Sequence, residues 1–182
     1  MIKALPLSLL LALAVGGLAR ADVHVVSYDA ANDLTRRTAG GLTFEYDQRL
    51  MFQRVLRVRS TEGPARADLK PANEAALGHG GLDAVIGRDA HEHDLYEVKP
   101  TAEGADLIRA FCPGSNRAWM AFGRLARFRD LRVQVLGDGG AAGKTHVCET
   151  LDFTWHGEWG LPSGQRVRDR DLKQPPLPGR PS

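Results

Sequence analysis

Two runs of alternating apolar residues in the C-terminal half of the chain constrain its fold more than any other feature. Every second residue from Leu131 to Val135 is a leucine or a valine, and apolar residues stand at most odd positions from Val147 to Trp155, with Glu149 as the exception. A period of two is typical of a strand with one buried face. The glycine-rich link over residues 137–143 can turn the chain back on itself, so we predict a β-hairpin.

The rest of the chain predicts further strands and a few short helices. Strands are expected over Val23–Tyr28, Leu42–Tyr46, Leu50–Val58, Leu95–Val98 and Trp119–Phe122, and helices over Pro71–Leu77, Leu82–Ile86 and Ala102–Phe111. Within Leu50–Val58 the even positions form the apolar face, which Arg54 interrupts. We therefore predict a single domain with an α+β fold: an antiparallel β-sheet of about five to seven short strands with two or three short helices.

The first 21 residues are typical of a secretory signal peptide. Lys3 supplies a positive start, an apolar run follows over Leu7–Leu18, and Ala19 and Ala21 match the small residues of a cleavage site. The run is too short to anchor the chain after cleavage. We therefore expect a periplasmic or secreted protein with no membrane anchor, made of an exported domain over residues 22–160 and a disordered tail rich in proline and arginine over residues 161–182.

The charge of the chain argues against a nucleic-acid partner. The net charge of +2 belongs to the precursor, because Lys3 and Arg20 lie in the predicted signal peptide and no acidic residue does. The rest of the chain has 22 basic and 22 acidic residues, so its formal charge is zero. A neutral chain lacks the basic balance that attracts a phosphate backbone.

A stretch that looks like a phosphate-binding loop ends at Thr145, after Gly143 and Lys144. The motif needs a glycine five residues before Gly143, and Asp138 stands there. Its carboxylate would repel a phosphate, and a strand-like run follows where the motif needs a helix. We expect no nucleotide site.

Cys112 and Cys148 are the two cysteines of the chain, and both lie in the exported part. In an oxidising compartment such a pair predicts a disulfide bond. The bond would close a loop whose chain entropy is worth roughly 3–4 kcal/mol. A metal-binding or catalytic thiolate is the alternative.

His91 and His93 form the clearest candidate metal site. Two residues apart on a strand, their imidazoles would share one face, and Asp89 or Asp94 could supply a third ligand. This predicts a Zn or Cu site in an alternative function as a metal-binding protein. The other reading is a solvated polar loop, and no other cofactor is expected.

No catalytic motif is recognisable in the chain. It contains neither a Gly-x-Ser-x-Gly turn nor a His-Glu-x-x-His helix, and no serine stands in a nucleophile motif. Glu45 and Asp47 lie two residues apart on an expected strand and could form a carboxylate pair. A hydrolase with an unrecognised carboxylate site is therefore a further alternative function.

A block of arginines over residues 109–132 is the candidate binding feature. It contains six arginines and one acidic residue, Asp130, and follows a block over residues 73–106 that is mainly acidic. Arg124, Arg127 and Arg129, in an expected exposed turn among aromatic residues, would bind an anionic envelope ligand or protein partner. The two blocks could instead pair with each other. We therefore expect an exported binding or interaction protein without identifiable catalytic machinery.

Overall fold

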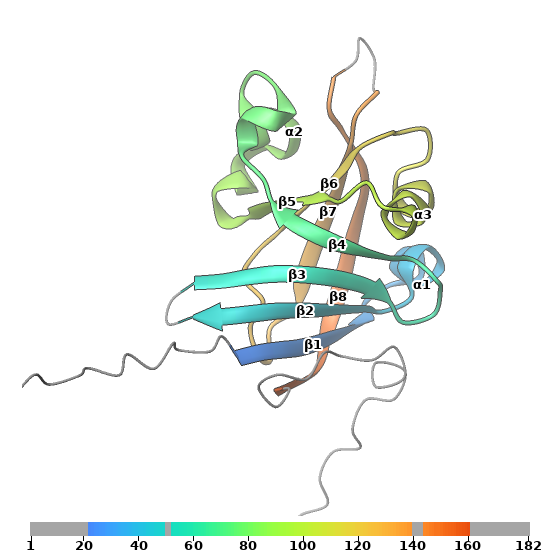
Figure 1. Ribbon diagram of the computed structural model, residues 1–182, viewed down its shortest axis with the longest axis vertical. Coiled ribbons are helices and arrows are strands. Elements are labelled where there is room, and N and C mark those ends of the chain that lie inside the picture. The colour runs from blue at the N-terminus through green and yellow to red at the C-terminus, as the bar shows by residue number, and fades with distance from the viewer. Residues whose placement is uncertain (1–21, 50–51, 140–143, 161–182) are drawn as a thin grey trace, which may run out of the picture.

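The computed structural model describes residues 22–49, 52–139 and 144–160, and these form a closed barrel of eight antiparallel strands (Figure 1). Each strand pairs with the next one along the chain, and the last strand pairs back with the first. The strands are β1 (Asp22–Ala30), β2 (Leu42–Arg49), β3 (Phe52–Ser60), β4 (Arg66–Pro71), β5 (Asp94–Val98), β6 (Ala118–Phe122), β7 (Leu131–Gly137) and β8 (His146–Gly160).

The predicted α+β fold, with an antiparallel sheet of about five to seven short strands, is wrong, because eight strands form a sheet that closes on itself. Closure depends on the pairing of β1 with β8, from His24 opposite Gly160 to Ala30 opposite Phe153. It also depends on β4, which was not predicted because its sequence is largely polar and ends in Pro71. The predicted hairpin is confirmed as the β7–β8 pair. The predicted signal peptide and tail lie outside the described residues.

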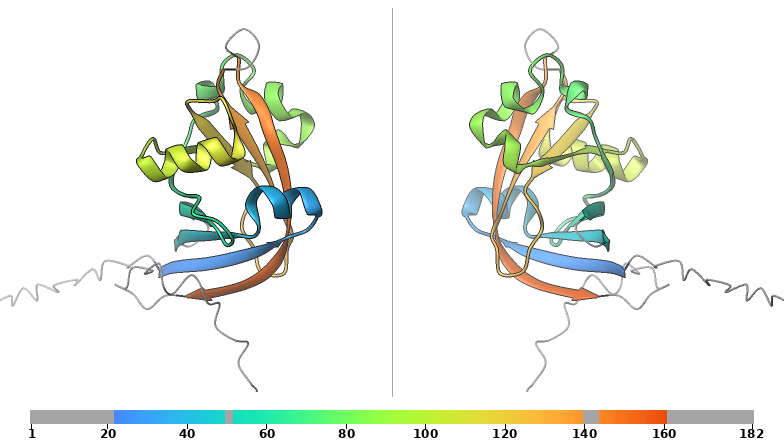
Figure 2. Two further views of the ribbon diagram at one scale, coloured as in Figure 1. Left: turned by 90° about the vertical axis from the view of Figure 1, so that its right-hand side faces the viewer. Right: turned by 90° about the vertical axis from the view of Figure 1, so that its left-hand side faces the viewer.

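Two helices close one end of the barrel, which we call the helix end. The α1 helix (Asp33–Ala39) joins β1 to β2, and α3 (Ala102–Phe111) joins β5 to β6; Figure 2 shows both on the same side of the molecule. The predicted helix over Ala102–Phe111 is confirmed with its cap, since the side chain of Thr101 accepts a hydrogen bond from the backbone N–H of Gly104. No helix in the described part of the chain is long and apolar enough to span a bilayer.

The segment between β4 and β5 covers part of the outer barrel wall. It contains a 3-10 helix (Glu74–Leu77), α2 (Gly81–Ile86) and a second 3-10 helix (Gly87–Glu92). Leu77 and Leu82 of this segment pack against Trp119 of β6 and Leu136 of β7. This contact explains why β6 is buried on both faces, as its apolar sequence predicts.

Side chains fill the barrel interior, and four aromatic rings contact one another there. Tyr96 stacks on Phe122 with a centroid distance of 5.0 Å, Phe122 contacts Phe44 at 5.2 Å, and Phe44 meets the edge of Tyr28 at 6.1 Å. An eight-stranded barrel is just wide enough to be filled in this way. Any ligand therefore has to bind outside this core.

Bulges shift the strand register at three points and change which side chains face inward. In β3 the register skips Leu56, so Val55 and Val58 are the core residues. Arg54 then falls on the outer face, and Phe52, which the alternation placed in the core, is exposed. The uniform alternation predicted for Leu50–Val58 is therefore wrong, because a bulge places two residues opposite one.

Candidate functional site

The barrel end opposite the helices, which we call the loop end, is covered by the β6–β7 loop, residues 123–130. Leu125 of this loop is 3% exposed and packs in the core. The side-chain amide of Gln53 makes two hydrogen bonds to the backbone of Leu125. Nε2 donates to the Leu125 carbonyl at 3.0 Å, and Oε1 accepts from the Leu125 N–H at 2.8 Å. The loop is thus fixed to the start of β3.

A buried carboxylate makes a second anchor for the loop. The Arg127 guanidinium donates to Oε2 of Glu158 at 2.7 Å, and the Tyr46 hydroxyl donates to Oε1 at 2.6 Å. His24 stacks on the Tyr46 ring, and its Nδ1 lies 3.2 Å from Oε1. The side chain of Glu158 is only 7% exposed. Arg127 therefore connects the loop to a carboxylate that is buried at the loop end of the barrel.

The electrostatics of this cluster keep Glu158 ionised. Burial alone would raise the pKa of Glu158, but the hydrogen bonds from Tyr46 and Arg127, with the charges of Arg127 and His24, lower it below its ordinary value. Burial and the neighbouring carboxylate raise the pKa of Tyr46, so its hydroxyl stays protonated and donates. Both oxygens of Glu158 accept hydrogen bonds, and its lowered pKa makes the carboxylate a weak base.

A bulge in β8 is the reason that Glu158 faces inward. Tyr28 pairs with Trp155, and Ser27 pairs with Gly157, so the register skips His156. Glu158 then lies opposite Val26, on the inner face with Trp155. The period-two pattern carried on from Trp155 would place Glu158 outside, so the local sequence does not predict this buried carboxylate.

Phe128 is the most unusual residue of the loop. Its φ is 58°, the one left-handed value at a non-glycine position in the described chain, and its side chain is 81% exposed. The ring lies 4.5 Å from that of Trp155, and the Trp155 backbone N–H donates to the carboxylate of Asp130 at 3.3 Å. A bulky residue held in this conformation is strained, and such strain is common at binding sites.

The structure divides the arginine block into paired and unpaired side chains. Arg109 pairs with Asp106 and Arg117 with Glu97, as expected if the acidic and basic blocks contact each other. Arg127 and Arg132 of the block pair instead with acidic residues further along the chain, Glu158 and Asp152 respectively.

Arg124 and Arg129 remain without an ion pair among the described residues, and both are exposed. Of the three arginines predicted to bind an anion, Arg127 is thus an anchor of the loop. Arg124 and Arg129 flank the exposed Phe128 and keep their charges available to a partner.

A groove beside the end of β8 is a less suitable site. Its volume is about 880 Å³, and it runs from Trp159 and His156 to the β3–β4 turn and Glu103 of α3. Four of its charged groups are already paired with each other: His156 contacts Asp29 at 2.8 Å, and Arg66 pairs with Glu103. A charged ligand would have to replace these ion pairs, whereas Arg124 and Arg129 have no ion pair among the described residues that a ligand would need to break.

The predicted metal site at His91 and His93 stays a prediction, because the side chain of His91 lies outside the described residues. His93 is half-buried. Among the described side chains, three potential metal ligands have their ligand atoms within 4.8 Å of one another, and His93 is not one of these three. In the predicted carboxylate pair, the Glu45 carboxylate lies 3.7 Å from the Arg57 guanidinium, which also pairs with Asp68 at 3.0 Å.

The predicted disulfide bond joins Cys112 to Cys148 and is confirmed. It links the C-terminal end of α3 to the start of β8, with a Cα–Cα distance of 5.1 Å. The bond therefore fixes the helix end of the barrel, away from the β6–β7 loop.

The chain matches no protein-family model, no curated protein sequence and no solved structure.

Proposed function

We propose that this chain is an exported binding protein that engages the acidic surface of a partner protein through the β6–β7 loop. Arg124 and Arg129 supply two unpaired positive charges, and Phe128 supplies an exposed aromatic ring between them. Arginine and aromatic residues are enriched at protein interfaces. A protruding ring suits a partner surface better than a small ligand, which would need an enclosing pocket.

The fixed conformation of the loop is the observation that carries this proposal. Leu125 is buried, Gln53 holds the Leu125 backbone, and Arg127 is tied to Glu158, yet the residues between and beside these anchors point to solvent. A surface that is ordered before binding loses less conformational entropy when a partner binds. The Phe128 ring contacts Trp155 but stays 81% exposed, so most of its apolar surface is left for a partner.

The proposed location in the periplasm or outside the cell is supported by two features. The N-terminal segment has the pattern of a signal peptide. The disulfide between Cys112 and Cys148 suits an oxidising compartment.

The test is affinity capture from an envelope fraction, followed by a binding measurement with the captured partner. Arg124→Ala/Arg129→Ala and Phe128→Ala should each weaken binding, the latter by at least about tenfold if the ring is a central contact. The effect of the arginines should decrease as salt rises. The matched control is Arg36→Ala/Arg109→Ala, which removes the same charge from helices α1 and α3 at the helix end. Binding that is unchanged in both loop variants would disprove the proposal.

A further inference from the structure

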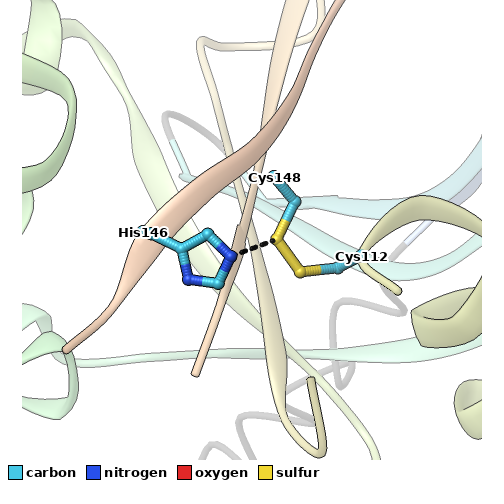
Figure 3. Close-up of side chains that lie close together, drawn as sticks. All are labelled: Cys112, His146 and Cys148. Carbon is cyan, nitrogen blue, oxygen red and sulfur yellow. Dashed lines mark hydrogen bonds between the residues drawn. A yellow bond between two sulfur atoms is a disulfide. The ribbon is translucent and has the colours of Figure 1, made fainter. Parts of the chain in front are cut away.

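The disulfide has a third potential metal ligand beside it. Nε2 of His146 lies 3.6 Å from Sγ of Cys148. Figure 3 shows the imidazole of His146 beside the disulfide bond. The two sulfurs and an imidazole nitrogen lie within 4.8 Å of one another. Cys112 comes from the end of α3, and His146 and Cys148 from the start of β8, so the barrel itself brings the three together.

The spacing of nitrogen and sulfur fits a shared metal ion. Zinc–sulfur and zinc–nitrogen bonds of about 2.3 and 2.0 Å, at a tetrahedral angle, place the two ligand atoms about 3.5 Å apart. The separation of Nε2 and Sγ in this structure is 3.6 Å. His146 would therefore need little movement to share an ion with Cys148.

The surroundings of the sulfurs allow an ion to enter from solvent. Cys112 is buried, Cys148 is half-buried and His146 is exposed, so the group opens outward on the His146 side. On the inner side Gly137 faces the pair: a Cβ at this position would overlap Cys112 Sγ and come within 2.8 Å of Cys148 Sγ. Glycine thus leaves the space that both sulfurs occupy.

The geometry points to a zinc site that the protein uses only when the disulfide is reduced, with Cys112, Cys148 and His146 as ligands. A dithiol reductant supplies the two electrons and becomes a disulfide itself, which leaves two thiols in the protein. When Zn²⁺ binds, the two thiols release their protons to solvent and coordinate as thiolates, and His146 coordinates through Nε2. Three protein ligands leave the fourth position for water or a ligand. The oxidised protein has no thiolates and binds no zinc here.

The site is tested by zinc binding to the purified protein in its two redox states. The protein is reduced with dithiothreitol, freed of the reductant under anaerobic conditions, and titrated with Zn²⁺ against a chromophoric chelator. Reduced protein should bind one equivalent, and oxidised protein should compete no better than buffer. Co²⁺ in place of Zn²⁺ should give the intense visible bands of a tetrahedral thiolate site.

Variants separate a site from general metal binding. In the reduced state, His146→Ala should weaken zinc binding by at least about tenfold, and Cys112→Ser/Cys148→Ser should abolish it. His156→Ala is the matched control, because this exposed histidine of β8 contacts Asp29 rather than a sulfur.

Circular dichroism decides the remaining case, in which reduction unfolds the protein. Zinc should then restore the folded spectrum, since binding to the folded site is coupled to folding. The inference is overturned if reduced protein binds no zinc, if His146→Ala binds as tightly as wild type, or if zinc fails to refold an unfolded reduced chain.

Discussion

Gly137 shows how a single residue accommodates the disulfide. It lies at the end of β7, and a Cβ there would overlap Cys112 Sγ and the hydroxyl oxygen of Ser115. Ser115 is itself held, since its hydroxyl donates to the carbonyl of Asp138 at 2.7 Å. Neither neighbour can therefore move away freely.

We predict that Gly137→Ala destabilises the oxidised protein by about 1–3 kcal/mol, the usual range for overpacking a filled site. Urea unfolding measures the change. Gly157→Ala in β8 is the control, because its Cβ would meet only Trp159, at an ordinary distance of 3.8 Å. Equal stability of the two variants would show that the sulfurs do not pack against Gly137.

Glu158 gives the molecule a pH-dependent anchor. The variant Glu158→Gln keeps the shape of the side chain but lacks the charge that Arg127 and Tyr46 bind. We predict that it is less stable than wild type at neutral pH by about 1.5–3 kcal/mol, the range for a hydrogen bond to a charged group.

The sign of the pH dependence follows from the lowered pKa of Glu158 in the folded state. The carboxylate's contribution to stability is complete above the pKa of an unfolded glutamate, about 4.3, and is lost as the pH falls through the lower folded pKa. The free energies of unfolding of wild type and Glu158→Gln should therefore converge in acid. A difference that stays constant from pH 7 to pH 3 would contradict this assignment.

At the scale of elements, the β6–β7 loop is ordered by contacts from other strands. Gln53→Ala removes both hydrogen bonds to Leu125, and Gln53→Glu keeps the acceptor but loses the donor. We predict faster amide hydrogen exchange over residues 123–130 in both variants, larger in Gln53→Ala, with the exchange of β1 and β2 unchanged. Exchange rates that equal those of wild type in the loop would show that Gln53 does not hold it.

The elements that local sequence predicts well are those with local causes. The α3 helix follows from Thr101 as a cap and from the residues up to Phe111, and the β7–β8 hairpin follows from two alternating runs around a glycine-rich link. The errors begin where a bulge changes the period. The alternation predicts Val147 on the same face as Leu151. The register skips Cys148, however, so Val147 lies opposite Leu136 on the outer face.

The candidate site could be predicted only in part, for the same reason. The exposed turn with Arg124 and Arg129 follows from composition, but the role of Arg127 depends on Glu158, which lies 31 residues further along the chain. The contact exists because a bulge at His156 turns Glu158 inward and because the barrel brings β8 beside the loop. Neither condition leaves a local pattern in the sequence.

At the scale of the whole molecule, the closure of the barrel is the property that the local sequence predicts least. The β1 and β8 strands are separated by more than 100 residues, and their pairing has no periodic signature. Closure removes both free edges of the sheet, which would otherwise be open to pairing with other chains. It also forms the two ends on which the loop and the disulfide lie.

The closed barrel makes a prediction that an open sheet does not. Asp29 of β1 lies directly opposite Thr154 of β8, and both side chains are exposed. Paired residues of antiparallel strands have Cα atoms about 4.5–5.5 Å apart, which is within the range of a disulfide bond. The double substitution Asp29→Cys/Thr154→Cys should therefore form a second disulfide on mild oxidation, detected by peptide mapping without reductant.

The control places the second cysteine elsewhere on the same strand. Thr150 of β8 is exposed too, but it lies opposite Gln134 of β7, so Asp29→Cys/Thr150→Cys should remain unlinked. Equal cross-linking in the two variants would indicate that β1 and β8 meet only transiently. The pairing of β1 with β8 also places Glu158 beside the β6–β7 loop, where it binds Arg127. If Asp29→Cys/Thr154→Cys forms no disulfide, the explanation of the ordered loop through Glu158 is therefore wrong as well.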